Sequence, residues 1–222
     1  SIISLFLSNH IHIYTTIKIK AKMKLLAFTD LHMSSYGFKK IKSKAKKQKP
    51  DLLISAGDLT IFEHGIDFIL NKLNSFNVKT LLIHGNHETA SVMKRRCKKY
   101  NNLIFIHKKQ YTHNGYIFLG YGGSGFALIE PEFYKTGEIF SKIIKKSKNK
   151  KIIFVTHAPP YGTKLDLIVT SHCGNKTFSN FVNKNKINLY ICGHLHENFG
   201  KKDHIRKTHV LNPGPYGKII KI

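Results

Sequence analysis

Leu81-Leu82-Ile83-His84-Gly85-Asn86-His87-Glu88 is a short apolar run that ends abruptly in polar residues. The run has the length of a buried β-strand, and Gly, Asn, His and Glu suit the turn that follows a strand. Ligand-binding groups of α/β sheets gather where the strands end. The stretch therefore predicts a strand that delivers polar side chains to a binding edge.

The same pattern of an apolar run ending in Asp, His or Asn recurs along the chain. The runs and the residues that follow them are Lys24 to Thr29 before Asp30-Leu31-His32, Leu52 to Ala56 before Gly57-Asp58, Ile152 to Thr156 before His157, and Leu189 to Cys192 before Gly193-His194-Leu195-His196. We expect these strand ends to bring oxygen and imidazole groups to one edge.

The segments between the runs have the spacing of helices and short strands. Ser34 or Ser35 suits the cap of a Lys-rich helix that ends before Pro50. Apolar residues recur at helical spacing from Ile66 to Phe76. Further helices are expected from Glu88 onward, around 137–146 and near 177–184, with short strands at 103–107 and 116–120 and paired strands around Asn212-Pro213-Gly214 within 208–222. Alternating strands and helices predict a layered α/β fold.

Length and composition fit one domain, expected at 23–222, with residues 1–22 as an extension. The chain has 222 residues, of which 41% are hydrophobic, enough for a substantial core. Met23 would be a natural start for the first strand, so we interpret residues 1–22 as an upstream artefact or an arm. This segment lacks the order of a signal peptide, because its apolar part precedes its basic residues.

Cysteine use and hydropathy indicate a cytoplasmic protein without a membrane segment. Cys97, Cys173 and Cys192 form an odd set without C-x-x-C spacing, which favours reduced thiols over a disulfide framework. No apolar run approaches the roughly 20 residues that cross a bilayer.

The formal charge of +25 raises the question of a polyanionic partner. Clustered Lys and Arg neutralise phosphates, so nucleic acid is a candidate partner. The excess is nearly all Lys, however, and it accompanies abundant Asn and Ile, as an AT-rich genome would produce. The basic runs lack the interleaved aromatic residues that stack on bases. We interpret them first as solvated faces.

The ordered set D-x-H, G-D, G-N-H-E, H and G-H-x-H resembles the calcineurin-like metallophosphoesterase superfamily, from about Met23 onward. Each motif alone is weak, but all of them in order behind strands are a strong signal. The resemblance implies two mixed β-sheets packed as a sandwich and flanked by α-helices, a four-layer α/β fold. It also implies two bound divalent metal ions.

Carried over position by position, the resemblance assigns the metal ligands. Asp30, His32 and His196 would bind one ion, Asn86, His157 and His194 the other, and Asp58 would bridge both. Nitrogen and oxygen ligands without thiolate suit Mn, our first expectation, or Fe, Zn, Co or Ni better than Mg. A hydroxide held by the metals is the expected nucleophile on phosphorus.

His87 would donate a proton to the leaving oxygen as a general acid, and Glu88 would orient it. Asp58 is followed by Leu59-Thr60, without the Asp-Arg-Gly of calcineurin-type Ser/Thr phosphatases. Other motifs resemble the Icc-related predicted phosphoesterases and the metallophosphoesterase-domain brain proteins: Gly120 to Ser124, His157 to Thr163 with Asp166, His172-Cys173-Gly174, Gly193 to Glu197 with Gly200, and Leu211 to Gly214. By this resemblance His172 and Tyr161 would contact the substrate.

These observations predict a metal-dependent phosphoesterase that prefers diesters, with a small or nucleotide phosphate ester as substrate. A nuclease with the same chemistry is the alternative prompted by the charge. A non-catalytic metal-binding scaffold on the same fold is a third possibility, which the complete set of ligands disfavours. The sequence leaves a homo-oligomer open.

Overall fold

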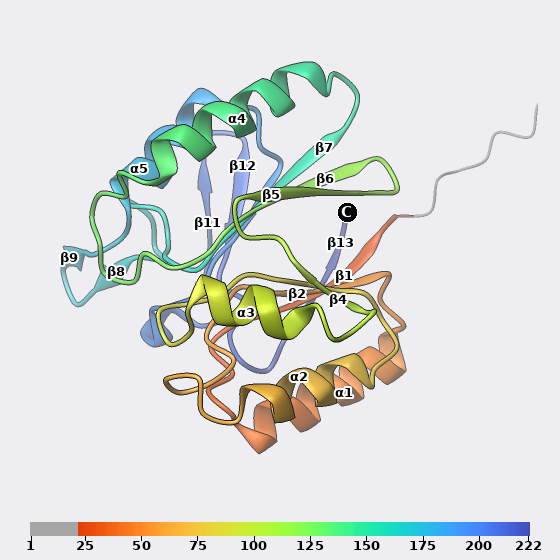
Figure 1. The fold of residues 1–222 in the computed structure, drawn as a ribbon. Helices are drawn as coiled ribbons and strands as arrows, with labels where there is room; N and C mark the ends of the chain where they lie inside the picture. The colour runs from red at the N-terminus through yellow and green to blue at the C-terminus, as the bar shows by residue number, and fades with distance from the viewer. Residues whose placement is uncertain (1–21) are drawn as a thin grey trace, which may run out of the picture.

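The computed structural model describes residues 22–222, which form two large facing β-sheets with helices outside them (Figure 1). The interpretation of residues 1–22 as an extension falls outside the described residues, apart from Lys22. The layered arrangement confirms the predicted α/β sandwich.

The first sheet has the strand order β13-β1-β2-β3-β4. Its strands are β1 (Lys24–Phe28), β2 (Leu52–Ser55), β3 (Thr80–Leu82), β4 (Leu103–Phe105) and β13 (Lys218–Lys221). Strands β1 to β4 are parallel, and β13 pairs antiparallel with β1. The carboxyl ends of β1, β2 and β3 therefore lie at the same edge.

The second sheet has the order β11-β12-β10-β7-β6-β5. Its strands are β5 (Lys109–His113), β6 (Tyr116–Tyr121), β7 (Lys151–Thr156), β10 (Leu189–Ile191), β11 (Lys202–Ile205) and β12 (Thr208–Leu211). The central strands β6, β7, β10 and β12 are parallel, and β5 and β11 are antiparallel edges. A small hairpin of β8 (Leu167–Ile168) and β9 (Ser171–His172) stands apart from both sheets.

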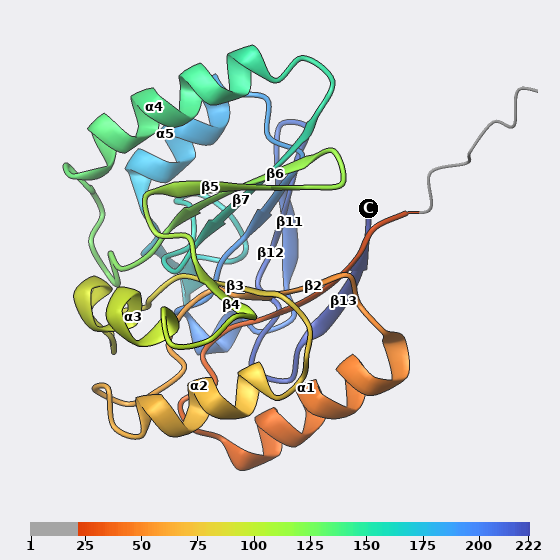
Figure 2. The ribbon, with the colours of Figure 1, turned by 45° about the vertical axis from the view of Figure 1, so that its right-hand side comes forward.

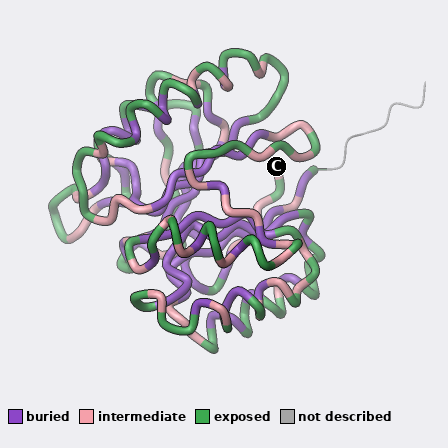
Figure 3. Tube along the Cα trace, in the orientation of Figure 1, coloured by how far each residue is buried: buried purple, intermediate pink, exposed green. Residues whose placement is uncertain are grey.

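The core follows from the two-residue period of the strands. In β1, Leu25 and Ala27 face the second sheet, whereas Leu26 and Phe28 face the outer helices. All of these side chains are fully buried, which is why the strand is a continuous apolar run. Figure 3 shows the same contrast between buried strands and partly exposed helices.

Helices cover the outer face of each sheet, as Figures 1 and 2 show from two sides. The first sheet is covered by α1 (Ser35–Gln48), α2 (Ile66–Asn74) and α3 (Ala90–Cys97), and the second by α4 (Phe133–Lys146) and α5 (Lys176–Lys184). The predicted α1 cap is Ser34, whose side chain accepts a hydrogen bond from the Gly37 amide. Helix α1 buries Phe38 and Ile41, and its lysines lie largely in solvent.

Three predicted elements differ in the structure. The strands expected to pair around Asn212-Pro213-Gly214 lie in different sheets, since β12 pairs with β10 and β11 while β13 returns to β1. Helix α4 begins at Phe133 and passes through Gly137, which packs closely against the Phe133 ring. Helix α3 begins after its cap Thr89, so Glu88 lies in the preceding loop.

Candidate metal centre

The predicted site residues meet where β1, β2, β3, β7 and β10 end. Asp30 follows β1, Asp58 follows β2, Asn86 and His87 follow β3, His157 follows β7, and His194 and His196 follow β10. Parallel strands explain the meeting, because each loop leaves its sheet on the same side. The expected single edge is in fact shared between two sheets.

Asp30 is the carboxylate of the first group of side chains. Its Oδ1 lies 3.7 Å from His196 Nε2 and 4.0 Å from His32 Nε2, and these two ring nitrogens are 3.3 Å apart. The other carboxylate oxygen, Oδ2, accepts hydrogen bonds from the Thr29 hydroxyl and the His194 amide. The His194 amide also donates to Oδ1, so Asp30 is held by the backbone while Oδ1 faces both imidazoles.

Asp58 is the centre of the second group. Its Oδ2 lies 3.3 Å from His157 Nε2, 3.7 Å from His32 Nε2 and 3.9 Å from His87 Nε2. The side-chain oxygen of Asn86 is 3.0 Å from the same nitrogen of His157. Oδ1 of Asp58 accepts a hydrogen bond from the His87 amide. One carboxylate oxygen therefore faces three imidazoles, as a bridging ligand would.

Backbone carbonyls orient two of the imidazoles. Nδ1 of His157 lies 2.9 Å from the Ala56 carbonyl oxygen, and Nδ1 of His32 lies 3.1 Å from that of Thr60. Because a carbonyl can only accept, Nδ1 is the donor in each ring, and Nε2 faces the carboxylates. This is the usual support of a histidine that binds a metal ion.

His194 contributes a buried nitrogen with no partner. Its Nε2 makes no hydrogen bond with any group of residues 22–222. Burial, together with His157, lowers the pKa of His194 to about 4, so the ring is neutral near pH 7. An unpaired polar atom in a buried site is costly, and a metal ion is a partner that would satisfy it.

Asp58 and His157 shift each other's protonation in opposite directions. Burial opposes the charge on Asp58, but the hydrogen bond and charge of His157 outweigh it and lower the pKa to about 2. Burial also disfavours a charged His157, yet the hydrogen bond and charge of Asp58 raise its pKa to about 9. In the metal-free chain a proton on His157 thus balances the carboxylate.

The donor set fits divalent cations. The Asp30–His32–His196, His32–Asp58–His87 and Asp30–Asp58–His157 groups each offer ligand atoms within 4.8 Å of one another. His32 belongs to two of these groups and Asp58 also to two, so the groups form one continuous cluster. Carboxylate oxygens beside neutral imidazoles are ligands of first-row transition metals. His87, not expected as a ligand, lies close enough to belong to the cluster.

The backbone at the site is unusual. Asp30, His32, Asp58 and His194 all have positive φ, between 43° and 73°, which L-residues other than Asn and Asp rarely adopt. Gly85 is required, because a Cβ there would overlap the Asp58 carboxylate; a Cβ at Gly193 would overlap Thr29. The polar residues thus occupy strained, closely packed turns.

Glu88 has a different role from the one expected. Its buried carboxylate accepts hydrogen bonds from the amides of Asp58, Thr60 and Gly85 and from the Thr60 hydroxyl. Nδ1 of His87 has no hydrogen-bond partner in residues 22–222, so Glu88 does not orient that ring. Glu88 instead joins the loops that follow β2 and β3, and burial and Asp58 raise its pKa.

Tyr161 and His172 lie by the β8–β9 hairpin. Their rings are 5.5 Å apart, and His172 Nδ1 is 2.8 Å from Oδ1 of the buried Asp166. Asp166 also accepts hydrogen bonds from the amides of Gly162 and Thr163. The described residues include no recorded contact between this pair and the metal ligands.

Sequence reasoning missed several contributors to this site. Thr29 binds Asp30, and Glu88 links the loops, as described above. Phe62 and Phe126 lie against His87 and His194, with ring centroids 4.6 Å and 4.3 Å apart. A strand or helix period could not have identified these two rings, because both stand in loops.

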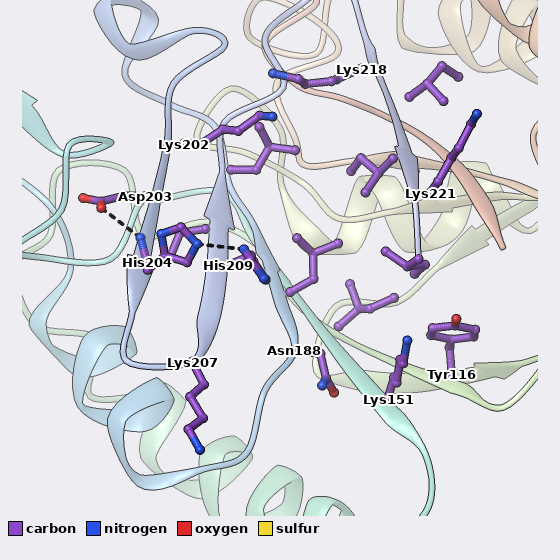
Figure 4. Close-up of a pocket in the computed structure, with 17 residues that line it drawn as sticks. Tyr116, Lys151, Asn188, Lys202, Asp203, His204, Lys207, His209, Lys218 and Lys221 are labelled. Atoms are coloured by element: carbon purple, nitrogen blue, oxygen red, sulfur yellow. Dashed lines mark hydrogen bonds between the residues drawn. The ribbon is translucent and has the colours of Figure 1, made fainter. Parts of the chain in front are cut away.

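A groove lies between the two sheets, away from the candidate ligands. It has β13 on one side and β11 and β12 on the other. It encloses about 590 Å³ and is drawn in Figure 4. Its lining combines aliphatic residues such as Ile153, Leu189 and Ile220 with Lys151, Lys202, Lys207, Lys218 and Lys221. His204 and His209 face each other across β11 and β12, with ring nitrogens 2.8 Å apart. We call this opening the lysine-rimmed groove.

The chain was compared with known proteins. A family model described as calcineurin-like phosphoesterase matches residues 23–198. An uncharacterized protein of Methanocaldococcus jannaschii is 33% identical over 213 residues, which cover 87% of this chain and 88% of that protein. No helix in residues 22–222 combines the length and apolar character needed to cross a membrane.

Solved structures are similar in fold at low identity. A Thermus thermophilus protein has a TM-score of 0.69 at 17% identity, over 88% of this chain and 90% of its own. A structure described as a dimetal phosphatase from Danio rerio has a TM-score of 0.65 at 9% identity, over 86% and 87%. The arrangement of both sheets is therefore shared with these proteins.

Proposed function

Since the chain belongs to the calcineurin-like phosphoesterase family, we propose that it is a dinuclear metal-dependent phosphodiesterase acting on small or nucleotide phosphate esters. Membership of the family implies a metal-dependent phosphoric ester hydrolase. The observation that carries the proposal is the convergence of three imidazoles on one oxygen of Asp58.

Two sets of ligands would hold the metal ions. Asp30, His32 and His196 form one, and Asn86, His157 and His194 form the other, with Asp58 between them. Manganese is the first candidate, because the set has oxygen and nitrogen donors without thiolate. The Danio rerio structure of similar fold is described as a dimetal phosphatase, which is consistent with two ions here.

The chain's own residues would position and protonate the substrate. When bound, two divalent cations would lower the pKa of a water and polarise the phosphoryl oxygens. The water oxygen bonds to phosphorus as the bond to the leaving oxygen breaks. His87 lies 3.9 Å from Asp58 at the edge of the cluster and would give its Nε2 proton to that leaving oxygen.

We propose diesters over monoesters from the side chains that contact the proposed ligands. Within residues 22–222, no Lys or Arg side chain is recorded in an ion pair or hydrogen bond with the proposed ligands. A monoester dianion would gain from such a cation, whereas a diester carries a single negative charge. Tyr161 and His172 are proposed to contact the part of the substrate that extends toward the β8–β9 hairpin.

The test compares bis-p-nitrophenyl phosphate with p-nitrophenyl phosphate, using metal-stripped protein with and without added Mn. We expect Mn-dependent turnover that favours the diester. His87→Ala should retain both ions and lose about 10²–10⁴-fold in kcat. As a matched control, His209→Ala alters a histidine of the lysine-rimmed groove and should leave turnover unchanged. Absence of turnover by protein that has bound two ions would refute the proposal.

A further inference from the structure

Two exposed phenylalanines border the metal centre. Phe62 is 69% exposed and Phe126 is 65% exposed. A single exposed apolar ring is ordinary on a protein surface. These two rings, however, rest on imidazoles of the site: Phe62 on His87 and Phe126 on His194. They therefore give the cluster of charged and polar groups an apolar border.

The position of Phe62 is fixed by its turn. Ile61 and His64 form an antiparallel bridge, and the two residues between them, Phe62 and Glu63, have φ of 48° and 64°. Turns with two positive φ values normally take Asn or Gly at these positions. Phe is disfavoured there, and its ring is too exposed to offset that cost by burial in the core.

Hydrogen bonds attach this turn to the loop that carries His87. The Glu63 amide donates to the His87 carbonyl oxygen at 3.1 Å. The Glu63 carboxylate accepts hydrogen bonds from the Thr89 amide and hydroxyl, both at 2.7 Å. The backbone of the Phe62 turn is thus attached to the loop that carries His87, which keeps the two side chains next to each other.

We infer that Phe62 is a platform for the leaving group and that the enzyme prefers phosphodiesters whose leaving group carries a planar aromatic ring, such as an aryl group or a nucleoside. The inference rests on the proposed function. If His87 protonates the leaving oxygen, the group attached to that oxygen must pass beside His87, where Phe62 offers an apolar face. Stacking between an aromatic side chain and a planar ring then stabilises the bound substrate.

Phe126 differs in its neighbour and provides an internal comparison. It contacts His194, which follows β10 of the second sheet, whereas the proposed acid His87 follows β3 of the first sheet. Substitution of Phe126 should alter metal binding through His194 or the binding of the substrate group that stays on phosphorus. The preference for an aromatic leaving group should therefore be lost when Phe62 is replaced and should remain when Phe126 is replaced.

The kinetic test uses two diesters that share a methyl group and differ in the leaving group, methyl 4-nitrophenyl phosphate and methyl 4-nitro-1-naphthyl phosphate. The naphthyl-to-phenyl ratio of kcat/KM is measured for the Mn-loaded wild type and variants. Phe62→Ala should lower the ratio by about fivefold or more, and Phe62→Tyr should retain it. Tyr134→Ala removes an exposed ring from α4 and should leave the ratio unchanged. An unchanged ratio in Phe62→Ala would overturn the inference.

A binding measurement separates this inference from the proposed function. 1-Naphthylmethylphosphonate has a carbon–phosphorus bond that is not hydrolysed, and the chain has no Trp to obscure naphthyl fluorescence. Phe62→Ala should bind it about fivefold or more weakly than the wild type, while binding methylphosphonate equally. If no ester is hydrolysed but this difference remains, the platform stands and the proposed reaction fails. Equal affinities for the naphthyl compound would refute the platform, with or without turnover.

Discussion

The candidate metal centre lies in the loops at the strand ends and the lysine-rimmed groove lies between the sheets, and the two regions differ in how their polar groups are arranged. At the metal centre, buried carboxylates face imidazoles that are themselves held by backbone carbonyls. In the groove, the His204 and His209 rings face each other and several lysines line the opening (Figure 4). One of them, Lys218, donates a hydrogen bond to the Gly200 carbonyl oxygen. Among the described residues lining the groove, Asp203 is the one acid, and it accepts hydrogen bonds from the Lys164 and His204 amides.

The register of the second sheet explains this difference. Ile153, Leu189, His209 and His204 form one row across β7, β10, β12 and β11. The row is apolar where it packs in the core between the sheets and becomes polar on the last two strands, at the groove. His204 and His209 are exposed to solvent on β11 and β12. Bringing the histidines of the candidate metal centre together, by contrast, removes polar groups from water, which costs free energy. The candidate site is therefore distinguished from the groove by the convergence of its imidazoles on two buried carboxylates.

The comparison makes its largest prediction for Asp58. Asp58→Asn keeps the shape of the side chain and removes the charge that would bridge two ions. We expect binding of the second ion to be lost and turnover to fall by more than about 10³-fold, because the metals supply several kcal/mol to the transition state. Metal content by mass spectrometry and kcat on the diester check this. Normal activity with two bound ions would remove Asp58 from the centre.

Metal affinity should rise with pH. In the metal-free protein the pKa of His157 is raised from 6.5 to about 9. A metal ion that binds at a pH below about 9 must therefore displace a proton from His157. The expected gain is about tenfold per pH unit for one displaced proton. Without metal, the stability contributed by protonated His157 is present below pH 6.5 and is lost as pH rises toward 9.

Calorimetric titration in two buffers of different ionisation enthalpy measures the proton released. The control is an NMR titration of His157 in the metal-free wild type and in metal-free Asp58→Asn, which lacks the carboxylate that raises the pKa, so that the ring should lose its proton at lower pH. A metal affinity independent of pH in the wild type would contradict the pairing of Asp58 with His157.

Glu88→Gln should lower the free energy of unfolding more than it lowers kcat. One carboxylate oxygen would become an NH2 group, so either the Thr60 amide, or the amides of Asp58 and Gly85, would face a donor in place of an acceptor. Unpaired buried donors typically cost about 1–3 kcal/mol. Denaturant unfolding of the metal-free variant measures this loss, and saturating metal should restore most of kcat. A large loss of kcat without a loss of stability would return Glu88 to the expected catalytic role.

The smallest effect is expected in the groove. His204→Ala with His209→Ala removes a solvent-accessible pair, so stability should change by no more than about 0.5 kcal/mol. Turnover on the diester should stay within about twofold. A marked fall in turnover would mean that the groove affects catalysis at the candidate metal centre. The distinction between the two regions would then be wrong.

The strands that end at the site could be predicted because each of them is apolar on both faces and stops at a polar motif, whereas the candidate ligands were assigned from the resemblance to the family. Both properties are local in sequence. The pairing partner of β13 could not be predicted, because 218–221 reads as a strand whichever sheet it joins. The role of Glu88 was missed for a related reason: its neighbours in the chain suggest a contact with His87, whereas its hydrogen bonds reach residues 28 and 30 positions earlier.

The return of β13 to β1 has a consequence for biosynthesis. Residues 218–221 pair with 24–27, and the Gly214 carbonyl, in the loop before β13, accepts a hydrogen bond from the Thr29 amide beside Asp30. On the ribosome, β1 leaves the exit tunnel long before its partner is made, and its outer edge stays unpaired throughout. Completion of the first sheet must therefore wait for β13 to emerge, and the loop that carries Asp30 gains its hydrogen bond to Gly214 only then.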